Sequence, residues 1–295
     1  MKILNFGSLN LDYIYQLEHF PKPGETMAVL DQKVLPGGKG LNQSLAMARA
    51  GATVMHAGLV GQGGEMLRRV LEEGGVDVSL LHETTTLQGN AVIQVNREGE
   101  NCILLFGGSN QAIDRKQVEE TLAGFDAGDV LVLQNEVSCL QDMVEQALAR
   151  GMRVVLNPSP FHKQLLDLPL GELDWIFINE IEGQQMTGHT DPDEILTEIR
   201  NRFPKLKVVL TLGGEGSICA VPEQPMIRQP IFPVGVVDTT AAGDTFSGYF
   251  IADYAQGLPP EECMRRAAAA AAISVSRVGA SVSIPTGAEV DALLE

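Results

Sequence analysis

The chain contains the stretch AAGDTFSG at residues 241–248, in which two alanines and a glycine lead into an acid. Apolar residues then recur at helical spacing through Phe246, Phe250 and Tyr254, and Gly257 ends the pattern. We expect a helix that begins beside Asp244. The first N–H groups of a helix have no carbonyl partners and the helix dipole is positive there, so this end of a helix attracts anions.

Asp244 has two interpretations. In most proteins an acid at this position only caps the helix, because its carboxylate accepts hydrogen bonds from the free N–H groups. A carboxylate beside an anion site is nevertheless unfavourable unless it takes part in a reaction, such as removing the proton from a hydroxyl group that attacks a phosphate. The sequence therefore makes Asp244 a candidate general base, beside a candidate anion site at residues 241–243.

The composition excludes several classes of protein. A chain of 295 residues with 44% hydrophobic residues can bury a large α/β core. The formal net charge of −17 argues against a nucleic-acid partner, which needs a basic surface. The four cysteines show no C-x-x-C spacing, and neither a secretory signal nor a membrane-spanning run is recognisable. We expect a cytoplasmic protein without a disulfide framework, a zinc site or membrane contact.

Short apolar runs alternate with helix-like segments along most of the chain. Such alternation is typical of a doubly wound, mainly parallel sheet with helices on both faces, and we predict one α/β domain of this kind over residues 1–295. The predicted strands are residues 3–6, 54–60, 130–133, 154–157, 175–179 and 208–212. The predicted helices are residues 40–50, 65–73, 140–150 and 191–203, with a tightly packed alanine helix around 267–272.

Two segments break the alternation, at approximately residues 13–35 and 88–106, and both are expected to form strands without intervening helices. In the second segment the stretch REGE at residues 97–100 is typical of the tight turn of a β-hairpin. We predict that the two segments form a small β-sheet lid that projects from the domain. One face of such a sheet needs cover, which a substrate or a second subunit would supply.

Two segments near the N-terminus are candidates for binding a polyol. GGKGLNQ at residues 37–43 lets the backbone pass close to a ligand, and Asn42 can both donate and accept hydrogen bonds. Its spacing is not that of a nucleotide-binding P-loop. GSLNLD at residues 7–12 follows the first strand, and Asn10 and Asp12 point to the same side of an extended segment. Each segment is also compatible with a plain turn.

Two further polar segments follow predicted strands. They are NEIE at residues 179–182 and TLGGEG at residues 211–216. In doubly wound sheets, ligands bind at the carboxyl ends of the strands. The first segment offers groups that can reach a phosphate or a metal-bound water, and the second offers flexible backbone for a nucleotide. Both segments are also compatible with plain turns.

Taken in order, these five segments resemble those of the ribokinase-like carbohydrate kinases, the PfkB family. The resemblance extends over nearly the whole chain, and its most specific parts are DTTAAGD at residues 238–244 and the upstream GGKG that precedes Asn42. It implies the ribokinase-like fold and MgATP-dependent transfer of the γ-phosphoryl group to a primary hydroxyl. D-ribose is the expected acceptor. Fructose, 2-keto-3-deoxygluconate, adenosine and pseudouridine stay open as alternatives, as does a sugar or nucleotide sensor without catalysis.

The resemblance also implies roles for individual residues. Asp244 would be the general base, beside an anion hole formed by Ala241, Ala242 and Gly243. The sugar would be held by Asn10, Asp12, Gly38, Lys39, Gly40, Asn42, Glu136 and Asp244. The nucleotide would contact Asn179, Thr211, Gly213, Gly216 and Gly243, while Mg²⁺ would be bound through water by Glu182. A K⁺-like ion would be held, partly by backbone oxygens, at Asp238, Thr240, Ser274, Arg277, Gly279 and Ser283.

The resemblance further implies a homodimer that forms through the lid. The sequence departs from the family pattern in three places. Ala267 and Ala268 stand where a polar residue often precedes the alanine run, which affects the expected contacts to the adenine base. Tyr13 stands where a smaller or imidazole side chain is common, and Gln62 replaces the usual acid. The first two departures leave phosphoryl transfer unaffected but bear on which base and which sugar the site accepts.

Overall fold

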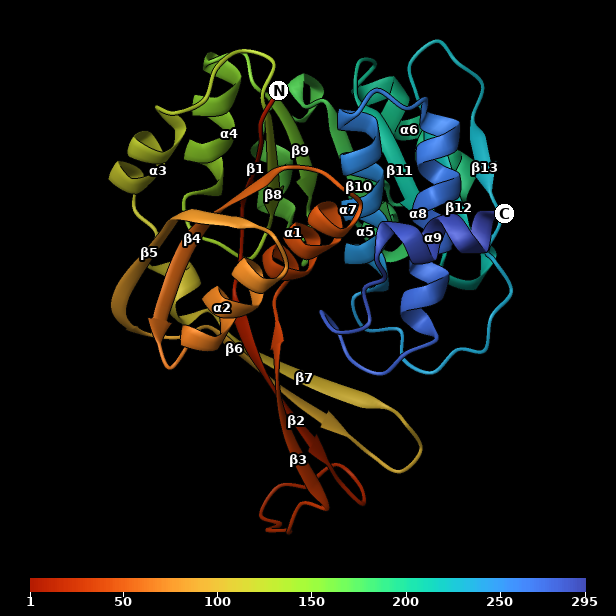
Figure 1. Cartoon of the computed structure of the whole chain (residues 1–295). Helices are drawn as coiled ribbons and strands as arrows, with labels where there is room; N and C mark the ends of the chain where they lie inside the picture. Colours follow the sequence, from red (N-terminus) through yellow and green to blue (C-terminus); the bar gives the residue numbers. More distant parts are fainter.

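The computed structural model describes residues 1–295 and contains a nine-stranded sheet and a separate four-stranded sheet (Figure 1). In spatial order the large sheet consists of β13 (Ile227–Gln229), β12 (Ser217–Ala220), β11 (Lys207–Thr211), β10 (Trp175–Asn179), β9 (Arg153–Asn157), β8 (Val130–Gln134), β1 (Ile3–Phe6), β4 (Val54–Gln62) and β5 (Asp77–Leu87). In this spatial order all neighbouring strands between β11 and β5 run parallel, whereas β12 is antiparallel to β11 and β13 is antiparallel to β12. The predicted mainly parallel sheet is confirmed.

Helices cover both faces of this sheet (Figure 1). On one face lie α1 (Lys39–Arg49), α2 (Glu65–Glu73), α7 (Ala242–Ala255), α8 (Pro260–Val275) and α9 (Gly287–Leu294). On the other lie α3 (Arg115–Leu122), α4 (Leu140–Ala149), α5 (Glu180–Thr187) and α6 (Pro192–Arg202). Short 3-10 helices occur at Gly108–Gln111, Lys163–Asp167, Leu170–Glu172 and Gly213–Glu215. The predicted helices are confirmed to within about one residue at most ends, and α8 extends well beyond the alanine run.

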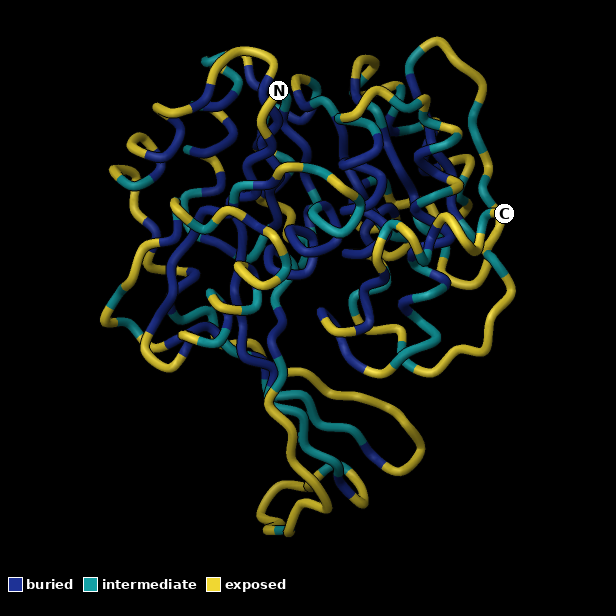
Figure 2. The backbone as a smooth tube through the Cα atoms, viewed as in Figure 1, coloured by how far each residue is buried: buried dark blue, intermediate teal, exposed yellow.

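The central strands are buried on both faces, which explains their continuous apolar runs. In β1, Ile3 packs into the core beneath α1 and α7, whereas Leu4 and Phe6 pack into the core beneath α3 and α4. The two cores contain 34 and 33 buried residues, so neither face dominates. Figure 2 shows these strands as a buried layer inside the body of the molecule.

Three strands of the large sheet are absent from the sequence prediction: β5, β12 and β13. β5 is the edge strand, and most of its side chains are exposed or half-buried, so its polar sequence lacks an apolar run. β12 and β13 have only four and three residues. For β5 and β13, an edge position removes the burial that makes a strand recognisable in the sequence. β12 is fully buried, and its shortness alone hides it.

The four-stranded sheet projects from the body as the predicted lid (Figure 1). Its order is β3 (Asp31–Gly37), β2 (Asn10–Gln16), β6 (Asn90–Val95) and β7 (Asn101–Phe106). The structure corrects the first predicted segment, because β2 begins at Asn10 and β3 reaches Gly37. The polar segment at residues 7–12 therefore leads directly into the lid. No helix combines the length and apolar composition that crossing a bilayer requires.

Candidate active site

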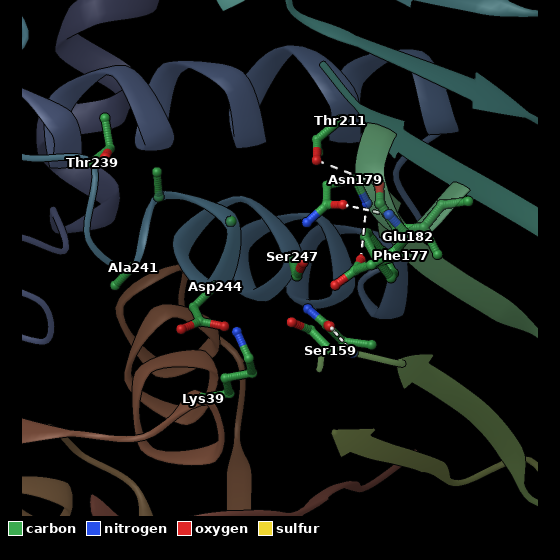
Figure 3. A pocket seen from close by; sticks show the side chains of 14 residues that line it. Lys39, Ser159, Phe177, Asn179, Glu182, Thr211, Thr239, Ala241, Asp244 and Ser247 are labelled. Atoms are coloured by element: carbon green, nitrogen blue, oxygen red, sulfur yellow. Dashed lines mark hydrogen bonds between the residues drawn. The ribbon is translucent and has the colours of Figure 1, made fainter. Parts of the chain in front are cut away.

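The candidate site lies where the carboxyl ends of β9, β10 and β11 meet the N-termini of α1 and α7. A cavity of about 240 Å³ occupies this position, and 14 residues line it. Figure 3 shows Lys39 and Asp244 facing it from one side, with Asn179, Glu182 and Thr211 on the opposite side. We call it the phosphate cavity. Segments that are far apart in the sequence thus meet at one edge of the sheet.

Helix α7 begins at the phosphate cavity with free N–H groups. Ala241 precedes the helix with φ of 60°, a left-handed conformation that few alanines adopt. No carbonyl oxygen accepts from the backbone N–H of Gly243 or Asp244. A Cβ added to Gly243 would meet no protein atom within 4 Å, so this residue adjoins open space. The start of α7 therefore has the unpaired donors and the space that an anion needs.

Asp244 is buried beside these donors, with 7% of its surface exposed. Both of its carboxylate oxygens accept a hydrogen bond from the first turns of α1. Asn42 Nδ2 donates to Oδ2 at 3.0 Å, and Gln43 Nε2 donates to Oδ1 at 3.0 Å. The carboxylate is consequently fixed by two amides rather than used as a helix cap, because it accepts from no backbone N–H group of α7.

The turn before α1 brings the backbone close to the end of β1. Gly38 has φ of 95°, and a Cβ there would lie 2.9 Å from the backbone nitrogen of Asn10. Gly40 packs against the backbone of Gly7 and Ser8 so closely that a side chain would clash. Glycine is required at both positions for these approaches. They place Lys39 beside Asp244 at the start of α7 (Figure 3).

Three carboxyl groups and one ammonium group gather next to this turn. Burial raises the pKa of Asp12 to about 7, and the nearby carboxylates of Glu136 and Asp244 contribute to the rise. Burial also raises the pKa of Glu136, although Lys39 and the hydroxyl of Ser8 oppose the change. Burial alone would lower the pKa of Lys39, but Asp244, Glu136 and Glu182 raise it above its usual value. The cluster is therefore short of positive charge.

Two amides in this region are held differently. Asn110 Nδ2 donates to Asn10 Oδ1 at 2.8 Å, which fixes the side chain of Asn10 at the base of the lid. Asn42 Oδ1, in contrast, is buried and has no hydrogen-bond partner. A buried acceptor without a partner is unfavourable and uncommon in folded proteins. Asn42 can therefore accept a hydrogen bond from a hydroxyl group of a ligand.

Asn179 and Glu182 form a capping box at the start of α5. Asn179 Oδ1 accepts from the N–H of Glu182 at 2.8 Å, and Glu182 Oε2 accepts from the N–H of Asn179 at 3.0 Å. This reciprocal pair stabilises the helix start. Both residues also line the phosphate cavity, and neither Glu182 Oε1 nor Asn179 Nδ2 makes a hydrogen bond. The pair thus has a structural role and still presents free polar atoms to the cavity.

A second cavity of about 500 Å³ adjoins the first, and Thr211, Thr239, Ala242 and Gly243 line both. Its remaining wall comes from the alanine face of α8, the segment 230–236 and the glycines of the turn after β11. Gly213 and Gly216 both belong to this turn and have positive φ values of 53° and 96°. Most of the wall is apolar, and we call this space the base cavity because it is a candidate site for the base of a nucleotide. Together the cavities have room for a nucleotide with its phosphates between them.

The residues predicted to hold a monovalent cation lie in two neighbouring loops and, for Ser274, at the end of α8. Asp238 Oδ1 accepts from the N–H and the hydroxyl of Thr240, and its Oδ2 accepts from the N–H of Gly279 at 2.9 Å. Burial alone would raise the pKa of Asp238, but these hydrogen bonds lower it below its usual value. Ser274 and Ser283 are buried and share a hydrogen bond of 2.8 Å. The side chain of Arg277 instead pairs with Glu289, outside this arrangement.

Several residues at the site are missing from the sequence prediction. Gln43 directly follows a predicted residue, so its position on the first turn of α1 could have indicated it. Asn110 reaches the site from the 3-10 helix after β7, and no sequence signal marks it. Other lining residues of the phosphate cavity were also not predicted, namely Asn157, Ser159, Thr239 and Ser247.

Comparisons with known proteins agree with this geometry. The model of the pfkB family of carbohydrate kinases matches residues 1–287. A protein named ribokinase from Haemophilus influenzae is 34% identical over 298 aligned positions, which cover 98% of this chain and 97% of the relative. A ribokinase from Staphylococcus aureus is 31% identical and covers 98% of both chains.

Solved structures are similar over the same length. A ribokinase from Cryptococcus neoformans in complex with ADP has a TM-score of 0.87 at 31% identity, over 99% of both chains. A ribokinase from Arabidopsis thaliana complexed with ribose and ATP has a TM-score of 0.86 at 29% identity, over 100% of this chain and 98% of the other. The family match, the relatives and the fold agree over nearly the whole sequence, so the chain belongs to the PfkB family of carbohydrate kinases.

Proposed function

We propose that the protein is an ATP-dependent kinase that transfers the γ-phosphoryl group to the primary hydroxyl of D-ribose and forms ribose 5-phosphate. The observation that carries this proposal is the position of Asp244. Its carboxylate lies at the start of α7, between free N–H groups on one side and a cluster of polyol-binding side chains on the other. Relatives named ribokinase, at 31–34% identity over nearly the full chain, support ribose as the acceptor.

The proposed reaction proceeds by direct transfer. Asp244 removes the proton from the sugar hydroxyl, whose oxygen then bonds to the γ-phosphorus while the bond from that phosphorus to the bridging oxygen of ADP breaks. The N–H groups of Gly243 and Asp244 stabilise the charge on the transferring group, with Ala241 and Ala242 shaping the turn. ADP leaves with the electron pair of the broken bond, and the proton stays on Asp244 until water accepts it.

The acceptor sugar lies, in this proposal, among the buried polar groups at the base of the lid. Asn42 Oδ1 has no partner and is available to a sugar hydroxyl, and Asp12 and Glu136 can each accept from hydroxyl groups. Asn10, Gly38, Lys39 and Gly40 complete this surface. Closure of the lid would exclude water, which otherwise competes with the sugar for the phosphoryl group.

The residues at the phosphate cavity fit a magnesium ion that arrives with ATP. Mg²⁺ prefers oxygen ligands and usually keeps several waters, so a single carboxylate at some distance is sufficient. Glu182 Oε1 makes no hydrogen bond and lies at the cavity, and Asn179 Nδ2 can donate to a phosphate oxygen. When bound, the ion would neutralise charge on the phosphates. Thr211, Gly213 and Gly216 would border the nucleotide.

A monovalent cation such as K⁺ also fits the chain, in the loops that contain Asp238 and Gly279. The hydrogen bonds of Asp238 hold these two loops together. The backbone carbonyl oxygens of Asp238, Thr240 and Gly279 accept no backbone hydrogen bond and remain available as ligands. Ser274 and Ser283 lie beside them, and Arg277 would contribute only its carbonyl oxygen, since its side chain pairs with Glu289. Replacing K⁺ by a bulky organic cation in the assay tests this requirement.

The experiment that tests the proposed function is ADP release with MgATP and K⁺ across a panel of acceptors. The panel contains D-ribose, 2-deoxyribose, fructose, 2-keto-3-deoxygluconate, adenosine and pseudouridine. A kcat/KM for ribose at least tenfold above every other acceptor supports the proposal. Preference for another acceptor would contradict ribose but leave the base and the anion hole in place, and binding without turnover would indicate a sensor.

One alternative acceptor has an observation in its favour. Relatives named deoxyribokinase from Salmonella typhi and Salmonella typhimurium are each 30% identical over 97% of this chain. Deoxyribose lacks only the 2-hydroxyl of ribose, and a site that hydrogen-bonds this hydroxyl would reject the deoxy sugar. The ratio of kcat/KM for the two sugars therefore decides between them.

We also propose that the protein is a cytoplasmic homodimer. The lid strand β7 exposes four consecutive apolar side chains, Ile103, Leu104, Leu105 and Phe106, of which 50–61% of the surface is accessible. An exposed apolar strand of this kind is a liability unless another surface covers it. The four cysteines are free, as expected in a reducing compartment. Sedimentation at micromolar concentration tests the dimer, and a pure monomer would contradict it.

A further inference from the structure

A continuous chain of buried amide side chains runs from Asp244 into the body of the domain. Gln43 Nε2 donates to Asp244 Oδ1 at 3.0 Å, and Gln134 Nε2 donates to Gln43 Oε1 at 2.8 Å. Gln134 Nε2 also donates to Asn5 Oδ1 at 2.9 Å. The three amides are completely inaccessible to solvent. They come from α1, β8 and β1, so the chain crosses from the helix that contacts Asp244 to the centre of the sheet.

The far end of this chain determines how each amide is oriented. Asn5 Nδ2 donates to the carbonyl oxygen of Gly40 and to Ser44 Oγ, both at 2.8 Å, which leaves Asn5 Oδ1 to face Gln134. Gln134 must then present Nε2, and Gln43 must accept with Oε1. An amide whose oxygen is engaged has only its NH₂ group left to offer. Gln43 consequently can face Asp244 only as a donor.

No other member of the chain is ionised. Ser44 Oγ lies 2.7 Å from His56 Nδ1, where the chain ends. Burial lowers the pKa of His56 to about 4, so the ring is neutral at neutral pH. Asp244 therefore faces a chain of uncharged amides. Gln43 donates an N–H to Asp244, and Gln134 and Asn5 hold Gln43 in the orientation that does so. A hydrogen bond donated to a carboxylate favours its ionised form.

We propose that Gln43 is a positioning residue for the base, which holds Asp244 Oδ1 so that the carboxylate presents Oδ2 to the sugar hydroxyl. This inference rests on the proposed function of Asp244. The role differs from that of Asn42, which contacts Oδ2 and has a free Oδ1 for the ligand. Gln43 has no free atom of this kind, because Gln134 and Asp244 occupy both ends of its amide.

The charged groups around Asp244 make this donor important. Asp12 and Glu136 are carboxyl groups whose charge opposes a negative charge on Asp244, and Lys39 favours it. Two acids thus act against one ammonium group. The amide of Gln43 adds a donor to the side that favours the carboxylate without adding a further charge.

The test is the pH profile of kcat/KM in the full-length protein with Gln43→Met, which keeps the length of the side chain and removes the donor. A hydrogen bond to a charged group changes an equilibrium by about ten- to a hundredfold, so we expect the acid limb to move up by roughly one to two pH units. The KM for ATP stays unchanged, because Gln43 is remote from the base cavity. Gln134→Met leaves Gln43 in place but unrestrained, so a smaller shift in the same direction is expected.

Thr121→Val is the matched control, since Thr121 is also a buried polar residue whose hydroxyl has no partner, and it belongs to α3 on the opposite face. The proposal is wrong if the acid limb of kcat/KM in both Gln43→Met and Gln134→Met lies within experimental error of that in Thr121→Val. If Gln43→Met does not fold, the acid limb of kcat/KM in Gln134→Met is the test, and an unshifted limb in that variant also contradicts the proposal.

A measurement without turnover separates this inference from the proposed function. Carbon NMR of protein labelled at its aspartate carboxyl groups follows the titration of Asp244 directly, with Asp244→Asn used for assignment. Movement of its midpoint to higher pH in Gln43→Met supports the role of Gln43 even if no sugar is phosphorylated. Activity on ribose in the wild type together with an unmoved midpoint leaves the kinase intact and removes the role of Gln43.

Discussion

The acceptor side and the donor side of the site are built in opposite ways. The acceptor side, around Asn10, Asp12, Asn42 and Glu136, consists of buried and half-buried polar groups, and side-chain hydrogen bonds fix Asn10, Asn42 and Glu136. The donor side is mainly apolar, and residues 230–236 that border it make no backbone hydrogen bonds. Fixed polar groups recognise a ligand by its pattern of donors and acceptors, whereas an apolar cavity recognises it by shape. We therefore expect strict selection of the sugar and looser selection of the nucleotide base.

The largest expected effect is that of Asp244→Asn, which removes the proposed base where the two sides meet. General base catalysis contributes about 10²–10⁴-fold, so we expect kcat to fall by that amount. The melting temperature should change little, because an amide has the same shape as the carboxylate. Turnover within threefold of the wild type would contradict the proposed role of Asp244.

Gly243→Ala tests the donor side at the anion hole. A Cβ at this position would meet no protein atom within 4 Å, and the backbone does not have positive φ, so the fold accepts it. Alanine is favoured over glycine in a helix by roughly 0.5–1 kcal/mol, so stability should hold or rise. Because the methyl group would enter the space for the transferring phosphate, we expect kcat to fall by about 10–100-fold. Wild-type turnover in a folded variant would place the phosphate elsewhere.

Asp12→Asn tests the electrostatics of the acceptor side. The pKa of Asp12 is about 7 in the folded protein, compared with 3.8 for an unperturbed aspartate. Between pH 4 and pH 7 the folded state therefore holds a proton that the unfolded state has lost. Stability from this group is present at low pH and is lost as the pH rises through 7, by roughly 2–4 kcal/mol in total. The variant should remove this loss, so its free energy of unfolding should exceed that of the wild type at pH 8 but not at pH 4.

The same variant should raise the KM for the sugar about tenfold, since a charge-assisted hydrogen bond to a hydroxyl is weakened. Denaturant unfolding at the two pH values and initial rates with varied sugar check the two parts. Equal pH dependence in the two proteins would show that Asp12 is ionised at neutral pH.

The smallest expected effect is the change of nucleotide. The walls of the base cavity contributed by α8 are alanines and a valine, and the backbone of this helix is hydrogen-bonded internally. The side chains of Ala268, Ala271 and Ala272 cannot form hydrogen bonds with the edge of a nucleotide base. We expect GTP to support turnover with a kcat/KM within about tenfold of that of ATP, as a difference of about 1.4 kcal/mol would give. Discrimination beyond a hundredfold would indicate a specific contact to adenine.

The sequence predicts those parts of the fold that burial determines. Strands such as β8 and β10 lie between two layers of helices, so every side chain in them before the last residue is apolar and the run is obvious. The lid is recognisable because its hairpin at residues 97–100 has turn residues and no helix intervenes. β5, β12 and β13 lie at or near the edges of the sheet, and their sequences carry no such mark.

The site is predictable to a different degree. Gly38 can be named because the turn before α1 requires a special backbone, and Gly243 because it stands directly before an acid at the start of a helix. Asn110 and Gln134 contribute through contacts with residues about 100 positions away, which no local pattern reveals. Glu182 belongs both to a capping box and to the wall of the phosphate cavity, and the same stretch of sequence is compatible with either role. Only the fold separates them.

Asp244 and the amides that hold it belong to opposite ends of the chain. Asn42 and Gln43 precede it by 202 and 201 residues. Contacts of such long range form late in folding, after the loops between them have been closed. During synthesis the acceptor side therefore exists only as an incomplete surface, without base or anion hole, until nearly the whole polypeptide has been made. A chain interrupted before α7 lacks both Asp244 and the free N–H groups at the start of that helix, so it lacks the proposed base and the proposed anion hole together.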